Sequence, residues 1–222
     1  MNSLGMYELT LELLNKAKTS SVTPEEWNII ANSKQLELVL FLYRQYQRDE
    51  SVIDKLRPII PEPVIIPNTG AATPGGEIFD LPSDYLRALS VSGTMHYTGE
   101  TCYADGDGVK LHPWFLLLDD VETIVDDNPY RKATIDTIYY RNSENTIRVK
   151  TGTNSYALTA RLRYLRQPQT IDVTLSPGAG DCELPEDVKN DLCYLIAKAY
   201  IDQQESGRYN QMAQETKEVI TN

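Results

Sequence analysis

The sequence has few residues of the kinds that carry catalysis or hold metals. It contains three cysteines and two histidines among 222 residues. No two cysteines are spaced as Cys-x-x-Cys, and neither His96 nor His112 has a second histidine or a cysteine at ligand spacing, so no zinc site is predicted. No glycine-rich phosphate loop opens a helix and no carboxylate pair stands out as an acid and base couple. We therefore expect no enzyme, no metal and no cofactor.

Long apolar runs and an excess of positive charge are also missing. The apolar stretch over residues 36–43 is interrupted by Glu37 and is too short to cross a bilayer, and residues 1–7 do not predict a signal peptide. The 32 acidic and 21 basic residues give a net charge of −11, which argues against binding nucleic acid as the main role. The odd, sparse cysteines indicate a reducing compartment and exclude a disulfide framework.

The composition that remains is that of a folded protein with a core. Hydrophobic residues make up 41% of the chain and charged residues 24%, which predicts one large domain or two small ones. The order of helical and strand-like patterns along the sequence predicts an α+β fold, with terminal helices packed as a small bundle and a central antiparallel β region. The expected parts are a helical bundle from 1–60 and 181–222, an extended Pro/Gly loop at 61–77, and a β-rich region with a short helix at 78–180.

The amino-terminal region predicts two helices. A Thr-Pro-Glu-Glu sequence at 23–26 is typical of a helix start, and the second helix is expected to run from Pro24 to about Arg48. One of its faces holds Trp27, Ala31, Leu38, Phe41 and Leu42, and the other holds Ile29, Leu36, Leu40 and Tyr43. A helix that is apolar on two faces needs cover on both sides. Its own fold or a neighbouring copy would provide that cover, and the sequence leaves both open.

The closing helix is expected to begin at Pro185, with carboxylates in its first turn. The expected apolar face of this helix is formed by Val188, Leu192, Leu195 and Ala199, and Ile196 and Tyr200 widen it. Gly207 is expected to end or bend this helix, and a more polar helical tail follows. Because both terminal regions carry strong apolar faces, we expect these helices to pack together.

In the middle of the chain, apolar and polar residues alternate, and β-branched and aromatic residues are frequent. Strands are expected over 85–97 and 158–165, and hairpins from 101–103 to 109–111 and from 134–140 to 146–150. Residues 119–127 predict a short helix. The strand pattern therefore indicates a sheet of several short strands connected mostly by turns.

Two features of this middle region suggest subunit contacts. The prolines at 61–77 disfavour helix, and Val64, Ile65 and Ile66 form an apolar patch that we expect to reach a neighbouring subunit. Basic residues gather further on, chiefly as Arg141, Arg148, Arg161, Arg163 and Arg166, with acids such as Asp119 and Asp120 nearby in the sequence. Either these charges pair within one sheet, or they fix the register between neighbouring copies.

Four short motifs occur in an order that resembles a known family. They are Thr23 to Trp27, Phe79-Asp-Leu-Pro-Ser-Asp-Tyr-Leu-Arg87, Tyr164-Leu-Arg-Gln-Pro168 and Leu184-Pro-Glu-Asp-Val188. The arrangement is similar to the head–tail connector proteins of tailed bacteriophages, the adaptor or ring proteins below the portal, and most of all to those of short-tailed and crAss-like phages. The resemblance spans most of the chain in short pieces.

The resemblance implies a structural virion protein and brings no catalytic motif. It implies a ring of about twelve copies, which binds the portal and other tail or ring proteins and continues the DNA channel without binding DNA specifically. It implies a place at the head–tail junction of the virion, and in the host cytoplasm during assembly, with no membrane partner. The alternative from the residues alone is a small non-enzymatic adaptor or assembly chaperone acting as a monomer or dimer.

Overall fold

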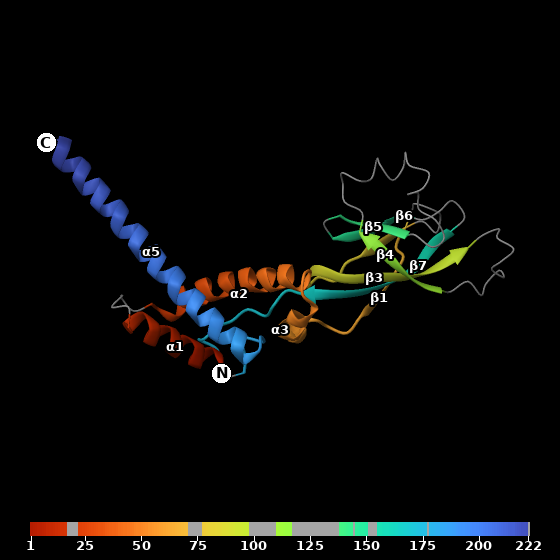
Figure 1. Cartoon of the computed structure of the whole chain (residues 1–222), viewed down its shortest axis with the longest axis horizontal. Coiled ribbons are helices and arrows are strands. Elements are labelled where there is room, and N and C mark those ends of the chain that lie inside the picture. The colour runs from red at the N-terminus through yellow and green to blue at the C-terminus, as the bar shows by residue number, and fades with distance from the viewer. Residues whose placement is uncertain are drawn as a thin grey trace. The chain divides into compact units, whose positions relative to one another are not determined.

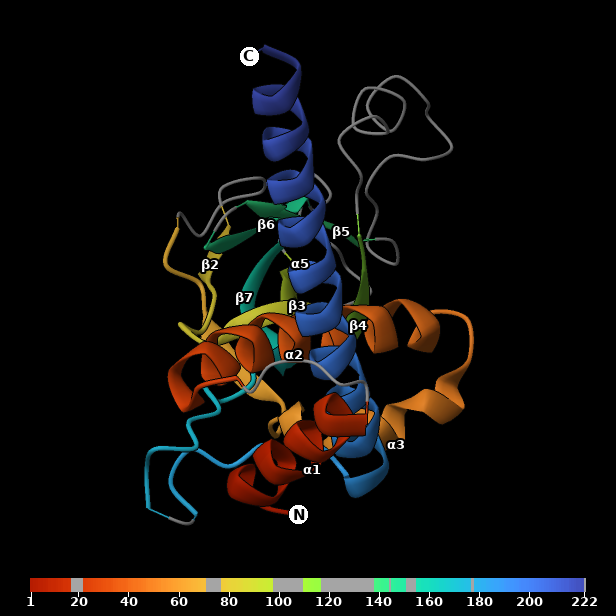
Figure 2. The ribbon, with the colours of Figure 1, turned by 90° about the vertical axis from the view of Figure 1, so that its left-hand side faces the viewer.

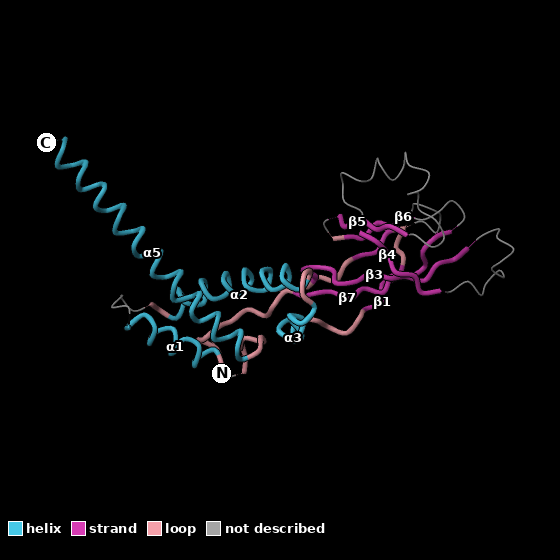
Figure 3. Tube along the Cα trace, viewed as in Figure 1, coloured by secondary structure: helices cyan, strands magenta, loops and turns pink. Residues whose placement is uncertain are grey.

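The computed structural model describes residues 1–16, 22–70, 77–97, 110–116, 138–143, 145–150, 155–176 and 178–221. The chain divides into two compact units, which we call the helical unit (residues 1–59 and 168–222) and the sheet unit (residues 60–167). Figure 1 shows helices in the first and strands in the second, and Figure 3 colours the two kinds of element separately. The predicted α+β class is confirmed.

The helical unit contains three long helices and three short ones among its described residues. They are α1 (Ser3–Lys16), α2 (Pro24–Tyr46), η1 (Glu50–Val52), α3 (Ile53–Leu56), η2 (Arg57–Ile59) and α5 (Glu186–Thr221). The helix α2 begins at the expected cap: the Thr23 hydroxyl accepts a hydrogen bond from the Glu26 amide at 3.3 Å, and the Glu26 carboxylate accepts one from the Thr23 amide at 3.1 Å. This capping box fixes where the helix starts.

The helix α5 packs against both α1 and α2, as expected from their apolar faces (Figure 2). Trp27 of α2 is fully buried, and its indole N–H donates to the hydroxyl of Thr10 in α1 at 3.1 Å. The Tyr7 ring meets the Trp27 ring edge-on at 5.8 Å. Leu192 of α5 is fully buried as well. Aromatic and aliphatic burial of this kind supplies most of the stability of such a bundle.

Two details of the helices differ from the expectation. Leu195 is 37% exposed and Phe41 is 53% exposed, although each was expected on a buried stripe. The buried face of α5 is rotated away from Leu195 and consists of Val188, Leu192, Cys193, Ile196, Ala197 and Tyr200. The helix does not end at Gly207, one of the two outcomes expected there, and the expected helical tail is present because α5 runs on to Thr221. One glycine costs a helix only about 1 kcal/mol, which the flanking residues can offset.

A loop of the helical unit is held on α2 by two asparagines one turn apart. Asn32 donates from its amide nitrogen to the Ile171 carbonyl and accepts from the Ile171 amide, both at 2.8 Å. Asn28 accepts from the Val173 amide at 3.1 Å and donates to the Asp172 carboxylate at 2.7 Å. These bonds satisfy backbone groups that a strand would otherwise pair. They place residues 168–180 with the helices, whereas the sequence placed them with the β region.

The sheet unit forms one seven-stranded sheet in the order β1-β7-β3-β4-β5-β6-β2. The strands are β1 (Val64–Pro67), β2 (Ile78–Asp80), β3 (Tyr85–Tyr97), β4 (Lys110–Leu116), β5 (Ile138–Ser143), β6 (Thr146–Lys150) and β7 (Ser155–Arg166). All neighbours pair antiparallel except β4 and β5, which are parallel. The sheet is therefore mixed and not wholly antiparallel. The parallel pair is possible because residues 117–137 form a connection long enough for a crossover.

One face of the sheet encloses an apolar core. Phe79, Ile138, Ile147 and Leu162 are fully buried in it, and the Trp114 ring lies 5.5 Å from that of Phe79. Gly93 of β3 leaves the space that the Trp114 indole fills: a Cβ atom at Gly93 would stand 1.9 Å from Trp114 Cζ2. The backbone of β3 thus approaches the tryptophan as closely as only glycine allows.

The two edge strands of the sheet approach each other, so the sheet is nearly closed. The Thr69 amide, just after β1, donates to the Ile78 carbonyl in β2 at 2.8 Å, and the Ile78 amide donates to the Asn68 side chain at 3.1 Å. The Asn68 amide group also donates to the Ala157 carbonyl in β7 at 3.2 Å. Closure leaves fewer unpaired backbone groups on the edge strands, where another chain could otherwise pair and start aggregation. The segment 61–77, expected as an extended loop, therefore contains the strand β1.

Candidate functional site

Metal-ligating and nucleophilic side chains are the first features to locate in the described residues. No group of three or more histidine, cysteine, aspartate or glutamate side chains is arranged to hold a metal among them. Cys193 is buried and its thiol donates to the Met6 carbonyl at 3.6 Å, and burial raises the pKa of Cys193 to about 11. Burial also raises the pKa of Cys182. Neither thiol is a thiolate at neutral pH, so neither is an activated nucleophile.

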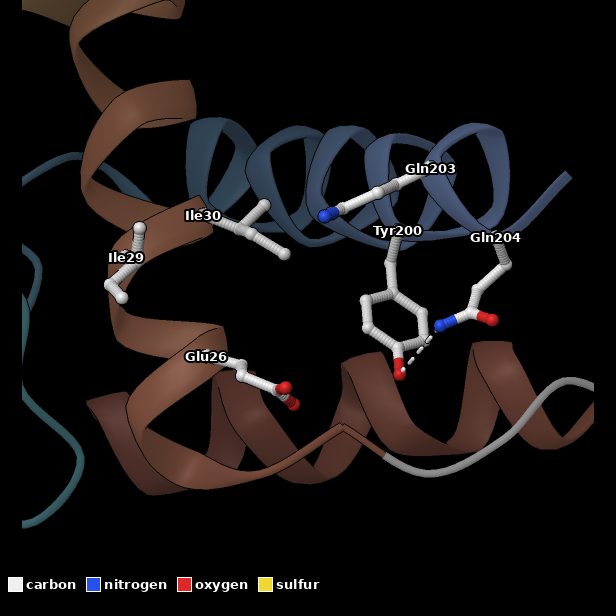
Figure 4. Close-up of a pocket in the computed structure, with 6 residues that line it drawn as sticks. All are labelled: Glu26, Ile29, Ile30, Tyr200, Gln203 and Gln204. Atoms are coloured by element: carbon white, nitrogen blue, oxygen red, sulfur yellow. Dashed lines mark hydrogen bonds between the residues drawn. The ribbon is translucent and has the colours of Figure 1, made fainter. Parts of the chain in front are cut away.

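A hollow lies where α2 and α5 cross in the helical unit. It has a volume of about 230 Å³ and is lined by Glu26, Ile29, Ile30, Tyr200, Gln203 and Gln204 (Figure 4). The Gln204 amide donates to the Tyr200 hydroxyl at 3.4 Å across one side of it. Amides, one carboxylate and isoleucines provide no acid, base and nucleophile set. The hollow is better described as a surface depression of mixed polar and apolar lining than as a reaction site.

The strands of the sheet unit are basic, although the whole chain is acidic. The described strands contain eight lysines and arginines but one acidic residue, Asp80. The five arginines predicted for an interface all lie in β5, β6 or β7, and four of them are exposed while Arg166 is half-buried. Asp119 and Asp120, the acids predicted to oppose them, lie outside the described residues. The structure thus brings the basic half of the predicted site onto one sheet.

Within that sheet the arginines form two groups. Arg161 of β7 pairs with Ser92 of β3 on one side and with Ile65 of β1 on the other. Arg163 pairs with Ser90 of β3, further along the same face. Ile65 is 67% exposed, so an exposed apolar side chain lies directly beside an exposed guanidinium. Ile65 of the expected apolar patch and Arg161 and Arg163 of the expected basic patch therefore share one surface, which we call the β7 face.

The second group lies on β5 and β6, where Arg141 and Arg148 stand directly opposite each other. Like charges at opposed positions of an antiparallel pair disfavour that pairing. The exposed ring of Phe115 in β4 lies 6.4 Å from that of Tyr139 in β5. Sequence reasoning missed Phe115, because its neighbour across the sheet is set by the parallel pairing of β4 and β5.

The predicted apolar patch at Val64 to Ile66 is divided by the pleat of β1. Ile65 and Val64 are exposed, whereas Ile66 is partly buried against the sheet core. Successive side chains of a strand point to opposite faces. Ile65 therefore points to the opposite face from Val64 and Ile66, and it alone of the three belongs to the β7 face.

The helical unit contributes an exposed surface of different chemistry. The second face of α2, formed by Ile29, Leu36, Leu40 and Tyr43, lies away from the residues that α2 buries in the bundle. Ile29 is 73% exposed and Leu36 is 40% exposed, while Leu40 and Tyr43 are half-buried. The sequence predicted this face and left its cover open, and the described fold leaves Ile29 and Leu36 exposed while it partly covers Leu40 and Tyr43.

Comparisons with known proteins identify no family for the chain. No protein-family model matches the chain, and a search of curated proteins finds no match. Of the helices in the described part of the chain, none is both long and apolar enough to cross a membrane.

Proposed function

We propose that the chain is a structural subunit of a ring that joins the capsid of a tailed phage to its tail, below the portal. The proposal rests on the order of the four sequence motifs and on one structural observation. A chain of net charge −11 presents a strongly basic sheet in one unit and an exposed apolar helix face in the other. Two unlike surfaces on one subunit are what head-to-tail assembly into a closed ring requires.

The β7 face supports a contact in which charge fixes the register. Arg161 and Arg163 would meet the acid-rich segment around Asp119 and Asp120 of the next copy. The Ile65 side chain beside them would be buried in the same contact. Exposed ion pairs contribute about 0–1 kcal/mol each, so the apolar side chains carry most of the affinity. The acids of the terminal helices would then face the channel, where negative walls repel DNA and let it pass.

A second candidate function is a small non-enzymatic adaptor or assembly chaperone. The two candidates differ in assembly: an adaptor of this kind stays a monomer or dimer with the portal present. A ring subunit forms a closed ring of about twelve copies.

The test is electron microscopy of the full chain mixed with the portal of the same phage. A ring with a central hole, bound at one end of the portal, is the expected result. A portal without added density, or with one or two copies attached, contradicts the ring.

A charge-reversal pair tests the β7 face within that ring. The variant Arg161→Glu with Arg163→Glu should fold normally and leave the portal bare, and particles made with it should have filled or leaky heads and no tails. The control Arg48→Glu with Lys198→Glu makes the same charge change at exposed positions of the helical unit and should assemble. Normally tailed particles from the β7 variant contradict the arginine assignment and leave the ring itself standing.

A further inference from the structure

The strands β4 and β5 carry two neighbouring aromatic rings on the face of the sheet that lies opposite the apolar core. Trp114 and Ile138 are buried in that core. Phe115 and Tyr139 directly follow them and point to the other face, because successive side chains of a strand alternate. The two strands pair Phe115 with Tyr139, and their ring centres lie 6.4 Å apart at an angle of 53°. Phe115 is 51% exposed, so this ring pair borders on solvent.

Three basic residues lie beside this ring pair on the same face. Lys150 of β6 stands directly opposite Tyr139, and Arg148 of β6 stands directly opposite Arg141 of β5. Both arginines are exposed, and Lys150 is half-buried. The two cross-strand pairs are two residues apart along the strands, which is about 7 Å. We call the five residues Phe115, Tyr139, Arg141, Arg148 and Lys150 the β5 face.

Acidic residues are scarce on the described strands around the β5 face. Asp80 of β2 is their one acidic residue, and it pairs with Thr146 at the start of β6. The strands therefore surround the two rings with positive charge, although the whole chain has a net charge of −11. Flat rings and cations side by side can hold a ligand that has both flat unsaturated surfaces and negative charge.

Single-stranded nucleic acid has both of these properties. Each nucleotide offers a flat base and one negative phosphate, and proteins that bind such strands without reading their sequence combine stacking rings with positive charge. An acidic peptide would supply carboxylates for the arginines but nothing that stacks on the rings. A double helix keeps the faces of its bases stacked inside. The ring pair therefore favours a single strand over both of these polyanions.

We propose that the β5 face binds single-stranded nucleic acid, with bases stacked on Phe115 and Tyr139 and a phosphate held by Arg148. Binding is independent of sequence, because every base has a flat face and every nucleotide a phosphate. The site goes beyond the proposed ring and does not require it. It shares no residue with the β7 face, so either assignment can fail without the other.

Fluorescence anisotropy of the full chain with a labelled oligothymidylate of about fifteen nucleotides measures this binding. The dissociation constant should be about 10⁻⁵ M and should rise with salt concentration. An oligouridylate of the same length is measured in parallel, and the tighter of the two shows whether the face prefers DNA or RNA. A duplex should bind at least about tenfold more weakly. Absence of binding to both single strands at about 10⁻⁴ M protein overturns the proposal, as does a duplex that binds as tightly as they do.

A variant without the two rings tests the stacking contact. Phe115→Leu with Tyr139→Leu keeps apolar side chains on the strands and removes the flat surfaces, so affinity should fall at least about tenfold. The matched control, Phe41→Leu with Tyr194→Leu, removes two exposed rings from the helical unit and should bind like wild type. Thermal unfolding followed by circular dichroism checks that both variants fold. A folded ring variant that binds like wild type overturns the proposal.

A charge variant tests the phosphate contact without touching the rings. Arg148→Gln removes one of two opposed arginines, so it should not lower stability. It should reduce the slope of log affinity against log salt by about 0.7, the value for one phosphate contact on a single strand. Arg48→Gln, at an exposed position of the helical unit, should leave the slope unchanged. An unchanged slope in the Arg148 variant overturns the assignment.

Competition distinguishes a nucleic acid from other anionic occupants of the β5 face. An unlabelled oligothymidylate should displace the labelled one, whereas polyglutamate and vesicles of phosphatidylserine should do so at least about tenfold less well, because neither offers bases to stack on the rings. Polyglutamate that competes equally well would make the occupant an acidic peptide. Vesicles that compete equally well would make it a membrane surface. Either result overturns the proposal.

Discussion

The helical unit and the sheet unit differ in where they place charge and apolar surface. The helical unit has 18 acidic and 11 basic residues, and its exposed apolar side chains include Ile29 and Leu36 on one face of α2. The sheet unit has 14 acidic and 10 basic residues, but its described strands hold eight of those basic residues and one acid. The comparison shows that net charge describes neither surface. One unit is suited to helix packing and the other to an acidic partner.

The largest expected effect tests which face of α5 the helical unit buries. Leu192 is fully buried, whereas Leu195 is 37% exposed one turn further on. The substitution Leu192→Asp should cost about 4 kcal/mol of unfolding free energy, because it buries an unpaired carboxylate. Leu195→Asp should cost less than about 1 kcal/mol. Urea unfolding followed by circular dichroism measures both, and equal losses would contradict the rotated face.

A smaller loss is expected in the sheet unit from Gly93→Val. A Cβ atom there would stand 1.9 Å from Trp114 Cζ2 and 2.7 Å from the Thr159 carbonyl oxygen, so the indole or the strand must move. Overpacking of this kind should cost about 3 kcal/mol. Ser90→Val, at an exposed position of the same strand, should change stability by no more than about 0.5 kcal/mol. Unfolding followed by Trp114 fluorescence separates them, and an unaffected Gly93 variant would refute the close packing.

A still smaller loss of stability is expected from a substitution where the loop of residues 168–180 contacts α2. The substitution Asn32→Ala removes both hydrogen bonds to the Ile171 backbone and should cost about 2 kcal/mol. Hydrogen exchange should become faster at the Ile171 amide, while the amides of the sheet unit keep their protection. Gln45→Ala, at an exposed position of α2, is the control. Unchanged exchange at Ile171 would show that the asparagine does not hold the loop.

The helical unit could be predicted from the sequence more fully than the sheet unit, because helix signals are local. The cap at Thr23 and the start of α2 at Pro24 are as predicted, since the bonds that define them join residues three apart. The strand β3, expected over 85–97, also has the expected bounds. The parallel pairing of β4 with β5 and the place of β1 beside β7 depend on partners far along the chain. No short pattern encodes those partners.

The candidate surfaces were predictable in composition and not in arrangement. The arginines and the apolar residues at 64–66 are visible in the sequence, but that Ile65 lies beside Arg161 follows only from the register of β1 with β7. The second apolar face of α2, formed by Ile29, Leu36, Leu40 and Tyr43, was visible in the sequence. The clamp by Asn28 and Asn32 was missed, although two asparagines one turn apart in a helix are a usable signal, because asparagine is a poor helix former and a good backbone partner.

The smallest expected effect is the pH dependence of stability. Low pH should affect the helical unit, and high pH should affect the sheet unit. In the helical unit, hydrogen bonds from Thr174 lower the pKa of Asp172, and the Ser3 amide lowers the pKa of Asp181. A lowered pKa in the folded state adds stability that is present above the unfolded value of about 3.9 and is lost as the pH falls below it. Acid should therefore weaken the helical unit.

In the sheet unit, burial and the hydrogen bond to Asp84 raise the pKa of Tyr164 to about 12. A raised pKa adds stability that is complete below the unfolded value of about 10 and is lost as the pH rises to about 12. Trp27 and Trp114 provide one buried fluorophore per unit, so single-tryptophan variants follow each unit separately. Tyr164→Phe should flatten the alkaline loss reported by Trp114, whereas Tyr194→Phe, at an exposed position of α5, should not. If Trp27 reports the same alkaline loss as Trp114, the two units do not respond to pH separately.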